Sequence, residues 1–508
     1  MRPAGVAQSE EGAPGPGEAR LLASGVLLQQ VAQGAGLLVL LAIVTILARR
    51  LSVAELGAYG LVASLAGYLL VLRNSVASSA VRAMAGAVDP AERGLVFSAA
   101  AALYAVAGLA TGLLIAGAGL LIAALILDGE LARDARVGAI GLGALTATGV
   151  AASVWLDALR AERQFVRAAG TEIVAVLLYL ATMLALIFGG AGLGVLIAAS
   201  GALPLYSGTL SALVARRAGL ALRLRPGAAS RGRVMAIVPT AGWLLVVELC
   251  NVAMYAFGRV ILGAYRTPTA VGLFEGPVRA HNLLYALGGA LAVPVVPSAS
   301  RYVATGDQRR LRDLAVRGTR YTLALFVPVC VTLIVLAGPI LEAWLGDRYA
   351  DGEVALAILV SYWLLYGGLI VTPGFLVGAG RAREVARIMV VVAAANLALS
   401  LALTPELGLE GPALGTAVPF VLAFPFMLRL GLRASGARLG ELARHAWAPS
   451  YLLAAALAVG LLGGRALLPM DETVAVIALA AGGVLLYWAI FYRLVLSASE
   501  RGLLSRRG

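Results

Sequence analysis

The chain has 508 residues, of which 61% are hydrophobic and only 13% are charged. Soluble globular proteins carry roughly 25% charged residues, so this composition excludes that class and indicates a membrane protein. The net charge of +13 comes from 40 basic residues, all of them Arg, and their distribution is typical of membrane orientation, not of nucleic-acid binding. Two Cys and two His are too few to predict a disulfide framework or a metal site, and no cofactor is expected.

The chain begins with residues 1–21, rich in Gly, Pro and Ala, which we expect to form a disordered cytoplasmic tail. Fourteen apolar segments follow, and nearly all reach the roughly 20 residues needed to cross a bilayer. They predict an all-α polytopic membrane protein with about 14 transmembrane helices. The segments are 22–48, 56–84, 95–127, 137–160, 170–190, 192–215, 235–264, 270–300, 318–345, 353–379, 384–404, 411–433, 447–468 and 473–496.

The distribution of arginines between successive loops supports this count of spans. If the N-terminus lies inside, thirty arginines fall in cytoplasmic segments and seven in outer loops. An excess of Arg in cytoplasmic loops sets the orientation of membrane proteins, so both termini are expected in the cytoplasm. The remaining three, Arg73, Arg259 and Arg279, lie within spans.

The chain also repeats itself. Leu56-Gly57-Ala58-Tyr59 opens the second span, and Val271-Gly272-Leu273-Phe274 opens the eighth, 215 residues later. Six spans between the copies predict two halves of the same topology, related by a pseudo-twofold axis along the membrane normal. The predicted parts are an N-terminal six-helix bundle (22–215), a basic cytoplasmic linker (216–234), a C-terminal six-helix bundle (235–433), two additional transmembrane helices (447–496) and a basic cytoplasmic tail (497–508).

The seventh and eighth spans each carry polar side chains along one helical face. Charged groups in a bilayer are costly, so these faces must meet other helices or water. They predict the wall of a transport cavity, and the alternative is a set of structural ion pairs between packed helices. The polar residues are Glu248, Asn251, Tyr255 and Arg259 on the seventh span and Glu275, Arg279 and Asn282 on the eighth.

Depth along the helices suggests roles for some of these residues. At 1.5 Å per residue, Arg259 and Glu275 both lie roughly 8 Å below the outer end, which predicts an ion pair between the two spans. Glu248 lies near the middle of the seventh span and is the leading candidate for H⁺ or Na⁺ coupling, with Glu275 the second. A carboxylate held by a structural bond is the alternative for Glu248. Gln29 and Gln33, one turn apart on the first span, are candidates for the cavity lining or for helix packing.

Five short sequence segments, which occur in the expected order along the chain, resemble Wzx-type oligosaccharide flippases. These are the polysaccharide transporters of the multidrug/oligosaccharidyl-lipid/polysaccharide flippase superfamily. The chain departs from their common pattern at Gly258, where an acidic residue often precedes the Arg, and at Phe274, where Tyr is usual. The resemblance covers most of residues 22–433. The five segments are residues 48–60, 294–314, 344–349, 378–381 and 408–415.

The resemblance implies two bundles around a V-shaped cavity and a transporter, not an enzyme. Its expected substrate is a polyprenyl-pyrophosphate-linked oligosaccharide, moved from the inner to the outer leaflet of the bacterial cytoplasmic membrane by alternating access. Polysaccharide polymerases and glycosyltransferases are possible partners, besides membrane lipid. Arg279 is the leading candidate for the pyrophosphate ligand, because guanidinium binds phosphate oxygens through two parallel hydrogen bonds. If Glu275 pairs with Arg279 instead of Arg259, then Arg259 or Arg73 takes that role.

Three alternatives remain. A flippase for a lipid-linked peptidoglycan precursor would have the same substrate chemistry. A cation-coupled multidrug exporter of the same superfamily would need an acidic cavity with an ion-binding carboxylate. The first six spans have no carboxylate at mid-membrane depth, because Asp157 and Glu172 lie near the inner boundary. A membrane glycan polymerase or glycosyltransferase is more distant, because no outer loop is long enough to hold a catalytic site and no metal, nucleotide or nucleophile motif is present.

Overall fold

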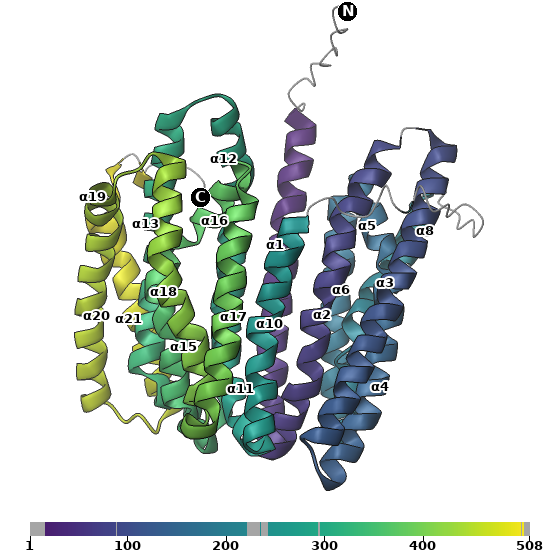
Figure 1. Ribbon diagram of the computed structural model, residues 1–508, viewed down its shortest axis with the longest axis horizontal. Coiled ribbons are helices and arrows are strands. Elements are labelled where there is room, and N and C mark those ends of the chain that lie inside the picture. The colour runs from purple at the N-terminus through teal and green to yellow at the C-terminus, as the bar shows by residue number, and fades with distance from the viewer. Residues whose placement is uncertain are drawn as a thin grey trace, which may run out of the picture.

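The computed structural model of the chain describes residues 16–87, 89–220, 234, 242–292, 295–498 and 500–501. Every regular element within these ranges is a helix, which confirms the all-α fold class. Long helices run side by side and short loops join their ends (Figure 1). The first half contains α1 (Pro16–Arg50), α2 (Val53–Gly86), α3 (Pro90–Leu125), α4 (Gly129–Ala152), α5 (Val154–Ala161), α6 (Phe165–Phe188), α7 (Leu193–Ala199) and α8 (Ala202–Arg217).

The second half begins at α10, and two further long helices complete the chain. The second half contains α10 (Gly242–Tyr265), α11 (Pro268–Ala292), α12 (Val295–Ala304), α13 (Gln308–Val335), α14 (Ala337–Leu345), η2 (Asp347–Gly352), α15 (Glu353–Tyr366), η3 (Gly367–Leu369), α16 (Val371–Gly378), α17 (Ala382–Leu407) and α18 (Glu410–Ser435). The last elements are α19 (Leu439–Leu442), the π-helical turn η4 (Ala443–Trp447), α20 (Ala448–Leu467) and α21 (Thr473–Leu494).

Helices lie over all fourteen apolar segments, but the count of fourteen spans stays a prediction. Eleven helical segments in the described chain are long and apolar enough to cross a membrane. The other three segments correspond to α2, α10 and α11. The apolar stretches of these helices are shorter, because polar residues interrupt them or because they begin next to undescribed residues. α1 begins at Pro16, six residues before the predicted start of the first span.

Among the described residues, helices break inside four of the predicted spans. The fourth is interrupted at Ser153, between α4 and α5, and the sixth at Ser200 and Gly201, between α7 and α8. In the ninth, α13 ends before Leu336, and in the tenth a 3₁₀ turn at Gly367–Leu369 separates α15 from α16. Broken helices inside a membrane are tolerated where other protein groups satisfy the freed backbone. Ser153 does so here, since its hydroxyl donates to the carbonyl of Val150 at 2.8 Å.

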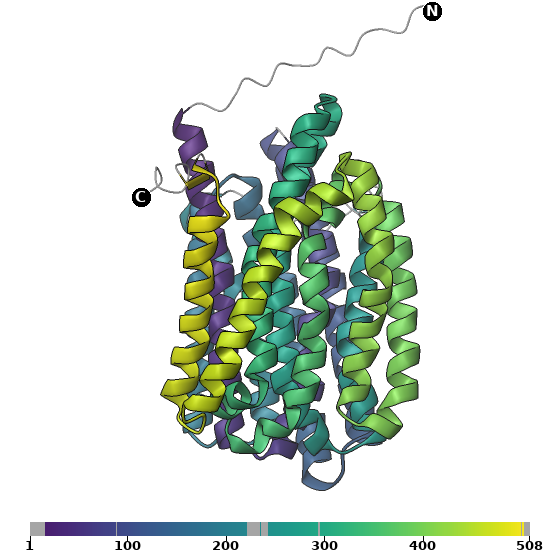
Figure 2. The ribbon, with the colours of Figure 1, turned by 90° about the vertical axis from the view of Figure 1, so that its left-hand side faces the viewer.

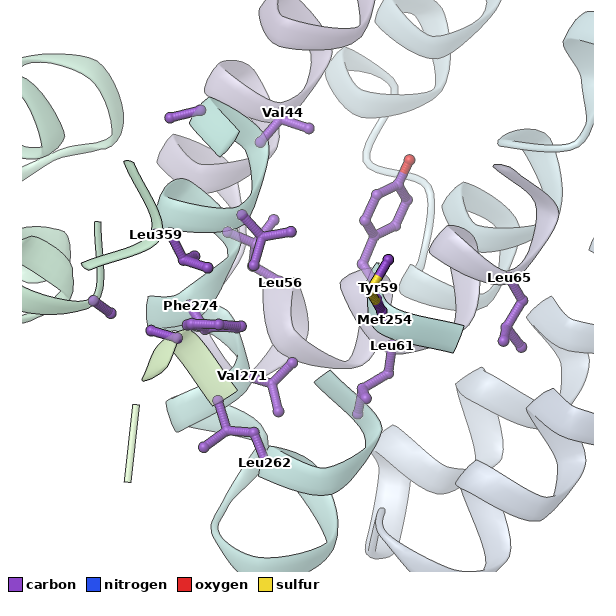
Figure 3. Packing of buried hydrophobic residues seen from close by; sticks show 14 of the residues in the cluster. Val44, Leu56, Tyr59, Leu61, Leu65, Met254, Leu262, Val271, Phe274 and Leu359 are labelled. Atoms are coloured by element: carbon purple, nitrogen blue, oxygen red, sulfur yellow. The ribbon is translucent and has the colours of Figure 1, made fainter. Parts of the chain in front are cut away.

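The two halves meet mainly where α2 packs against α10 and α11. Buried side chains from both halves form one continuous cluster there, which includes Leu56 and Tyr59 on α2, Met254 on α10, and Val271 and Phe274 on α11 (Figure 3). Otherwise the helices of each half pack mostly against one another. We therefore keep the division into 22–215 and 235–433 as a proposal for how the chain is organised.

Helices α20 and α21 pack on the outside of the second half, against α13 (Figure 1). The chain after α21 is held there by Glu500, which pairs with Arg320 and accepts a hydrogen bond from the Tyr321 hydroxyl at 2.6 Å. Burial raises the pKa of Glu500, but hydrogen bonds from Tyr321 and Ser497 outweigh it and hold that pKa below its usual value. The added helices are therefore fixed to the second half by specific bonds.

The first turn of α1 and the last turn of α21 lie at the same end of the bundle (Figures 1 and 2). The same end holds the turn from α12 to α13, with exposed Arg301, Arg309 and Arg310. We call it the Arg-rich end. The turns at 51–52 and 266–267 lie at the opposite end. Which end faces the cytoplasm stays a prediction from the distribution of Arg.

Labelling of single cysteines tests this orientation. In a chain without Cys250 and Cys330, we expect Arg309→Cys to react with a membrane-impermeant maleimide only from the cytoplasmic side. Asp351→Cys should react only from outside. Both residues are exposed, but Arg309 lies in the first turn of α13 at the Arg-rich end. Asp351 lies in η2, where Arg348 and Tyr349 bond to the carbonyl of Ala48 beside the turn at 51–52. Labelling of both positions in intact cells would contradict the predicted topology.

Candidate functional site

Two glycines allow α2 and α11 to cross at very short range, near the end opposite the Arg-rich end. A Cβ atom on Gly57 would lie 1.9 Å from the carbonyl oxygen of Pro268, and one on Gly272 would lie 1.9 Å from that of Val53. These are the two glycines that the internal repeat relates. The contact is therefore reciprocal, and each half contributes the small residue that lets the other approach.

A buried ionic triad lies one turn deeper. Arg259 on α10 donates from Nε to Glu275 Oε1 at 2.5 Å, and Arg279 on α11 donates from Nε to Glu275 Oε2 at 3.1 Å. The side chains of Arg259 and Glu275 are only 2% and 1% exposed. Gly60 on α2 makes room for the carboxylate, because a Cβ there would lie 2.2 Å from Glu275 Oε1. The triad is thus closed by a helix of the other half.

The predicted ion pair between Arg259 and Glu275 is present. The pairings of Glu275 with Arg259 and with Arg279, which the sequence left as alternatives, are both present: Oε1 accepts from Arg259, and Oε2 accepts from Arg279 and, at 3.5 Å, from Arg259 as well. Two guanidinium groups and one carboxylate leave one positive charge in excess. The Arg279 side chain is 12% exposed, and its terminal amino groups have no acceptor among the described residues. They remain available for an anion.

Further bonds tie the halves together at the same end. Trp344 donates from its indole nitrogen to the Thr45 hydroxyl at 2.6 Å. Arg348 donates to the carbonyl of Ala48 at 3.0 Å, and Arg49 donates in the other direction to the carbonyl of Ala343 at 3.0 Å. With the glycine crossing and the triad, these bonds close the bundle between its halves at the end opposite the Arg-rich end.

Replacing one of the crossing glycines should open this contact. We expect Gly57→Ala to cost about 1–3 kcal/mol of stability, because the added methyl group meets backbone atoms that cannot rotate away. Gly86→Ala on the same helix is the control: a Cβ there meets no atom within 4 Å, and Ala favours the helix. The midpoint of thermal unfolding of the purified variants measures the difference. Equal effects at the two positions would contradict the close crossing.

A second polar group lies inside the first half and lines a cavity of about 380 Å³ between α1, α2, α4, α5, α6 and α8. Arg73 donates to Asp157 Oδ2 at 2.7 Å and to the Ser153 hydroxyl at 3.2 Å. Asp157 is fully buried and also accepts from Arg160 at 2.9 Å, while Arg160 reaches Glu172 at 3.0 Å. Two guanidinium groups and two carboxylates make this network neutral.

Gln29 and Gln33 line the same cavity as Arg73, together with Asn74. The structure thus brings together three of the residues proposed from the sequence. Gln29 also accepts a hydrogen bond from Arg160 at 3.4 Å. The sequence argument missed Asp157, Arg160 and Glu172 as members of this site, although the spacing of Asp157 and Arg160, three residues apart, matches one helical face.

The other proposed residues lie on α10 and α11. Asn251 donates to the hydroxyl of Tyr285 at 3.0 Å, and Asn282 contacts His281 at 3.3 Å. His281 is 1% exposed and shares a 2.7 Å hydrogen bond with the Tyr362 hydroxyl. The side chains of Glu248 and Tyr255 are outside the described part of the chain, so their predicted roles are not placed.

Comparison with known proteins adds a family, a curated relative and two solved structures. The family model described as "Polysaccharide biosynthesis protein" matches residues 46–352. A curated relative from Haloferax volcanii, the "Probable low-salt glycan biosynthesis flippase Agl15", is 22% identical over 162 residues, which is 32% of this chain and 34% of that protein. The chain thus matches about a third of the length of that relative.

Two solved structures share the fold. One is a lipid II flippase MurJ in an inward closed conformation, with a TM-score of 0.70 and 14% identity over 92% of this chain and 99% of that one. The other is an inward-facing multidrug resistance MATE family transporter of the MOP superfamily, with a TM-score of 0.67 and 18% identity over 79% of this chain and 95% of that one. The family match covers more than half of the sequence, and the chain therefore belongs to the polysaccharide biosynthesis protein family, with a fold of the MOP superfamily.

Proposed function

We propose that the protein is a flippase that moves a polyprenyl-pyrophosphate-linked oligosaccharide from the inner to the outer leaflet by alternating access. The observation that carries this proposal is the triad of Arg259, Glu275 and Arg279, a buried group with one excess positive charge at the junction of the two halves. A pyrophosphate cannot cross roughly 30 Å of hydrocarbon unaided, and a fixed cation in a protein cavity offsets that cost. The curated relative is named as a probable glycan biosynthesis flippase, and the chain shares its fold with a lipid II flippase. Both observations support the same activity.

The charges decide between the candidate phosphate ligands. Arg73 is held by Asp157 in a neutral network, whereas Arg279 shares Glu275 with Arg259 and keeps its terminal amino groups available. We therefore assign the pyrophosphate to Arg279, with Arg259 as the second cation of the site. Asn251, Tyr255, Asn282, Gln29 and Gln33 are proposed as ligands for sugar hydroxyls.

The energy source and the partners are further proposals. Glu248 and Glu275 are the candidates for coupling to H⁺ or Na⁺, and Glu248 is the better one because Glu275 already holds two guanidinium groups. We place the protein in the bacterial cytoplasmic membrane with both termini in the cytoplasm, on the basis of the Arg distribution. Glycosyltransferases and a polysaccharide polymerase would supply and consume its substrate.

The alternatives differ in the charge of their substrates. A multidrug exporter for cationic drugs fits poorly with a junction that carries excess positive charge. A flippase for a lipid-linked peptidoglycan precursor would use the same pyrophosphate chemistry, and the fold shared with the MurJ structure keeps it as the second candidate.

Proteoliposomes that contain only this protein test the activity. We expect the protein to move a fluorescent polyprenyl-pyrophosphate-linked oligosaccharide between leaflets, detected by an impermeant quencher, and to leave a cationic dye in place. A peptidoglycan precursor serves as the competing substrate. Transport of the dye without transport of either glycan lipid would overturn the proposal.

A further inference from the structure

The cavity in the first half offers neutral hydrogen-bonding groups that the protein itself does not use. Gln33 and Ser207 line the cavity, and their side chains make no hydrogen bond to another residue in the described part of the chain. Asn74 uses only its carbonyl oxygen, which accepts from Arg73 at 3.3 Å, so its amide hydrogens remain available. Amide and hydroxyl groups can donate and accept, which suits the hydroxyls of a sugar.

The charged groups around this cavity are fully occupied with one another. Asp157 bridges Arg73 and Arg160, and Glu172 takes the second face of Arg160. The Tyr104 hydroxyl donates to Asp157 at 2.6 Å, which satisfies the buried carboxylate further. A charged ligand entering the cavity would therefore find no unpaired opposite charge and would lose its own hydration. The cavity favours an uncharged occupant.

The cavity also lies next to the cationic triad. Gly60 on α2 packs against Glu275 of the triad, and Gly67 further along the same helix lines the cavity. These two positions are seven residues apart, which is roughly 10 Å along a helix at 1.5 Å per residue. A ligand whose pyrophosphate binds at Arg279 can therefore place the group attached to it in this cavity.

We propose that the cavity in the first half binds the sugar next to the pyrophosphate and selects an uncharged sugar over an acidic one. The inference rests on the proposed function, because it takes the pyrophosphate to bind at Arg279. The volume of about 380 Å³ is near the lower limit of small-molecule sites, roughly 300–1,000 Å³, and so suits a short saccharide more than a whole repeat unit.

Three lipids separate the contributions: polyprenyl pyrophosphate without a sugar, the same lipid with a neutral hexose, and the same lipid with a hexuronic acid. Binding is measured by calorimetry on the full chain in nanodiscs. We expect the wild type to bind the hexose lipid most tightly. Gln33→Leu should lose about threefold to tenfold in affinity for it, as for one hydrogen bond, and bind the bare lipid unchanged. Gln30→Leu is the matched control, an exposed amide on the same helix that does not line the cavity.

Glu172→Gln tests the charge argument separately. It removes one of the two carboxylates and leaves the cavity with one excess positive charge, so it should raise the affinity for the hexuronic acid lipid relative to the hexose lipid. Equal losses of affinity for the hexose lipid in Gln33→Leu and Gln30→Leu would overturn the inference. So would a wild type that binds the hexose lipid no more tightly than the bare lipid. In either case, binding of the bare lipid would leave the proposed function intact. Failure of the wild type to bind any of the three lipids would overturn both.

Discussion

Arg279→Lys should lose about tenfold to a hundredfold in affinity for polyprenyl pyrophosphate, the range expected for one or two hydrogen bonds between charged groups. In the wild type, Arg279 bonds to Glu275 through Nε, and its terminal amino groups have no acceptor among the described residues. A lysine keeps the charge but has a single ammonium group, which cannot reach Glu275 and a phosphate in the same fork-like way. Calorimetry with the bare lipid measures the loss, and glycan export should fall with it.

Folding must be separated from binding in this experiment. A lysine four residues after Glu275 can still form an ion pair on the helix, so we expect Arg279→Lys to be expressed and to unfold near the wild-type temperature. Arg266→Lys is the control, an exposed arginine between α10 and α11 that donates to the carbonyl of Pro405 and lies outside the triad. Unchanged binding and export would remove Arg279 as the phosphate ligand, and loss of folded protein would make its role structural.

The junction of the two halves was largely predictable because its geometry is local. The rise per residue is constant in a helix, so the positions of Arg259 and Glu275 relative to one short turn gave their depths and predicted their contact. The offset between Gly57 and Gly272 marked equivalent positions of the two halves, and the structure brings these positions into contact. Such inferences need only helix geometry and a correct alignment of two neighbouring spans.

The network in the first half could not be predicted in this way. Arg73 on α2 and Asp157 on α5 are separated by 84 residues and meet because these two helices pack against each other. Periodicity does not reveal which distant helix lies beside which, nor where a span will break. The sharing of Glu275 was missed for a different reason: the sequence argument treated the carboxylate as one acceptor, although its two oxygens accept separately.

Removal of Glu275 should destabilise the protein more than removal of Arg259, because the carboxylate is shared. Glu275→Gln keeps the volume but removes the carboxylate that Arg259, 2% exposed, and Arg279, 12% exposed, share. Arg259→Ala leaves Glu275 paired with Arg279. Breaking a buried pair typically costs about 3–5 kcal/mol, so we expect that range for Glu275→Gln and a smaller loss for Arg259→Ala.

A double-mutant cycle on these two changes isolates the interaction that crosses from α10 to α11. If the pair stabilises the junction, the double variant should be more stable than the sum of the single losses predicts, by about 0.5–3 kcal/mol. Unfolding of the purified proteins in mild detergent measures the cycle. Additive losses would mean that the 2.5 Å contact contributes no coupling.

Because Gly60 of the first half packs directly on Glu275, a weakened triad should also loosen the contact between the halves at this end. Accessibility of a cysteine in place of Ala58, which is fully buried in the same cluster on α2, would then rise together with the loss of stability, linking the buried charges to opening of the bundle.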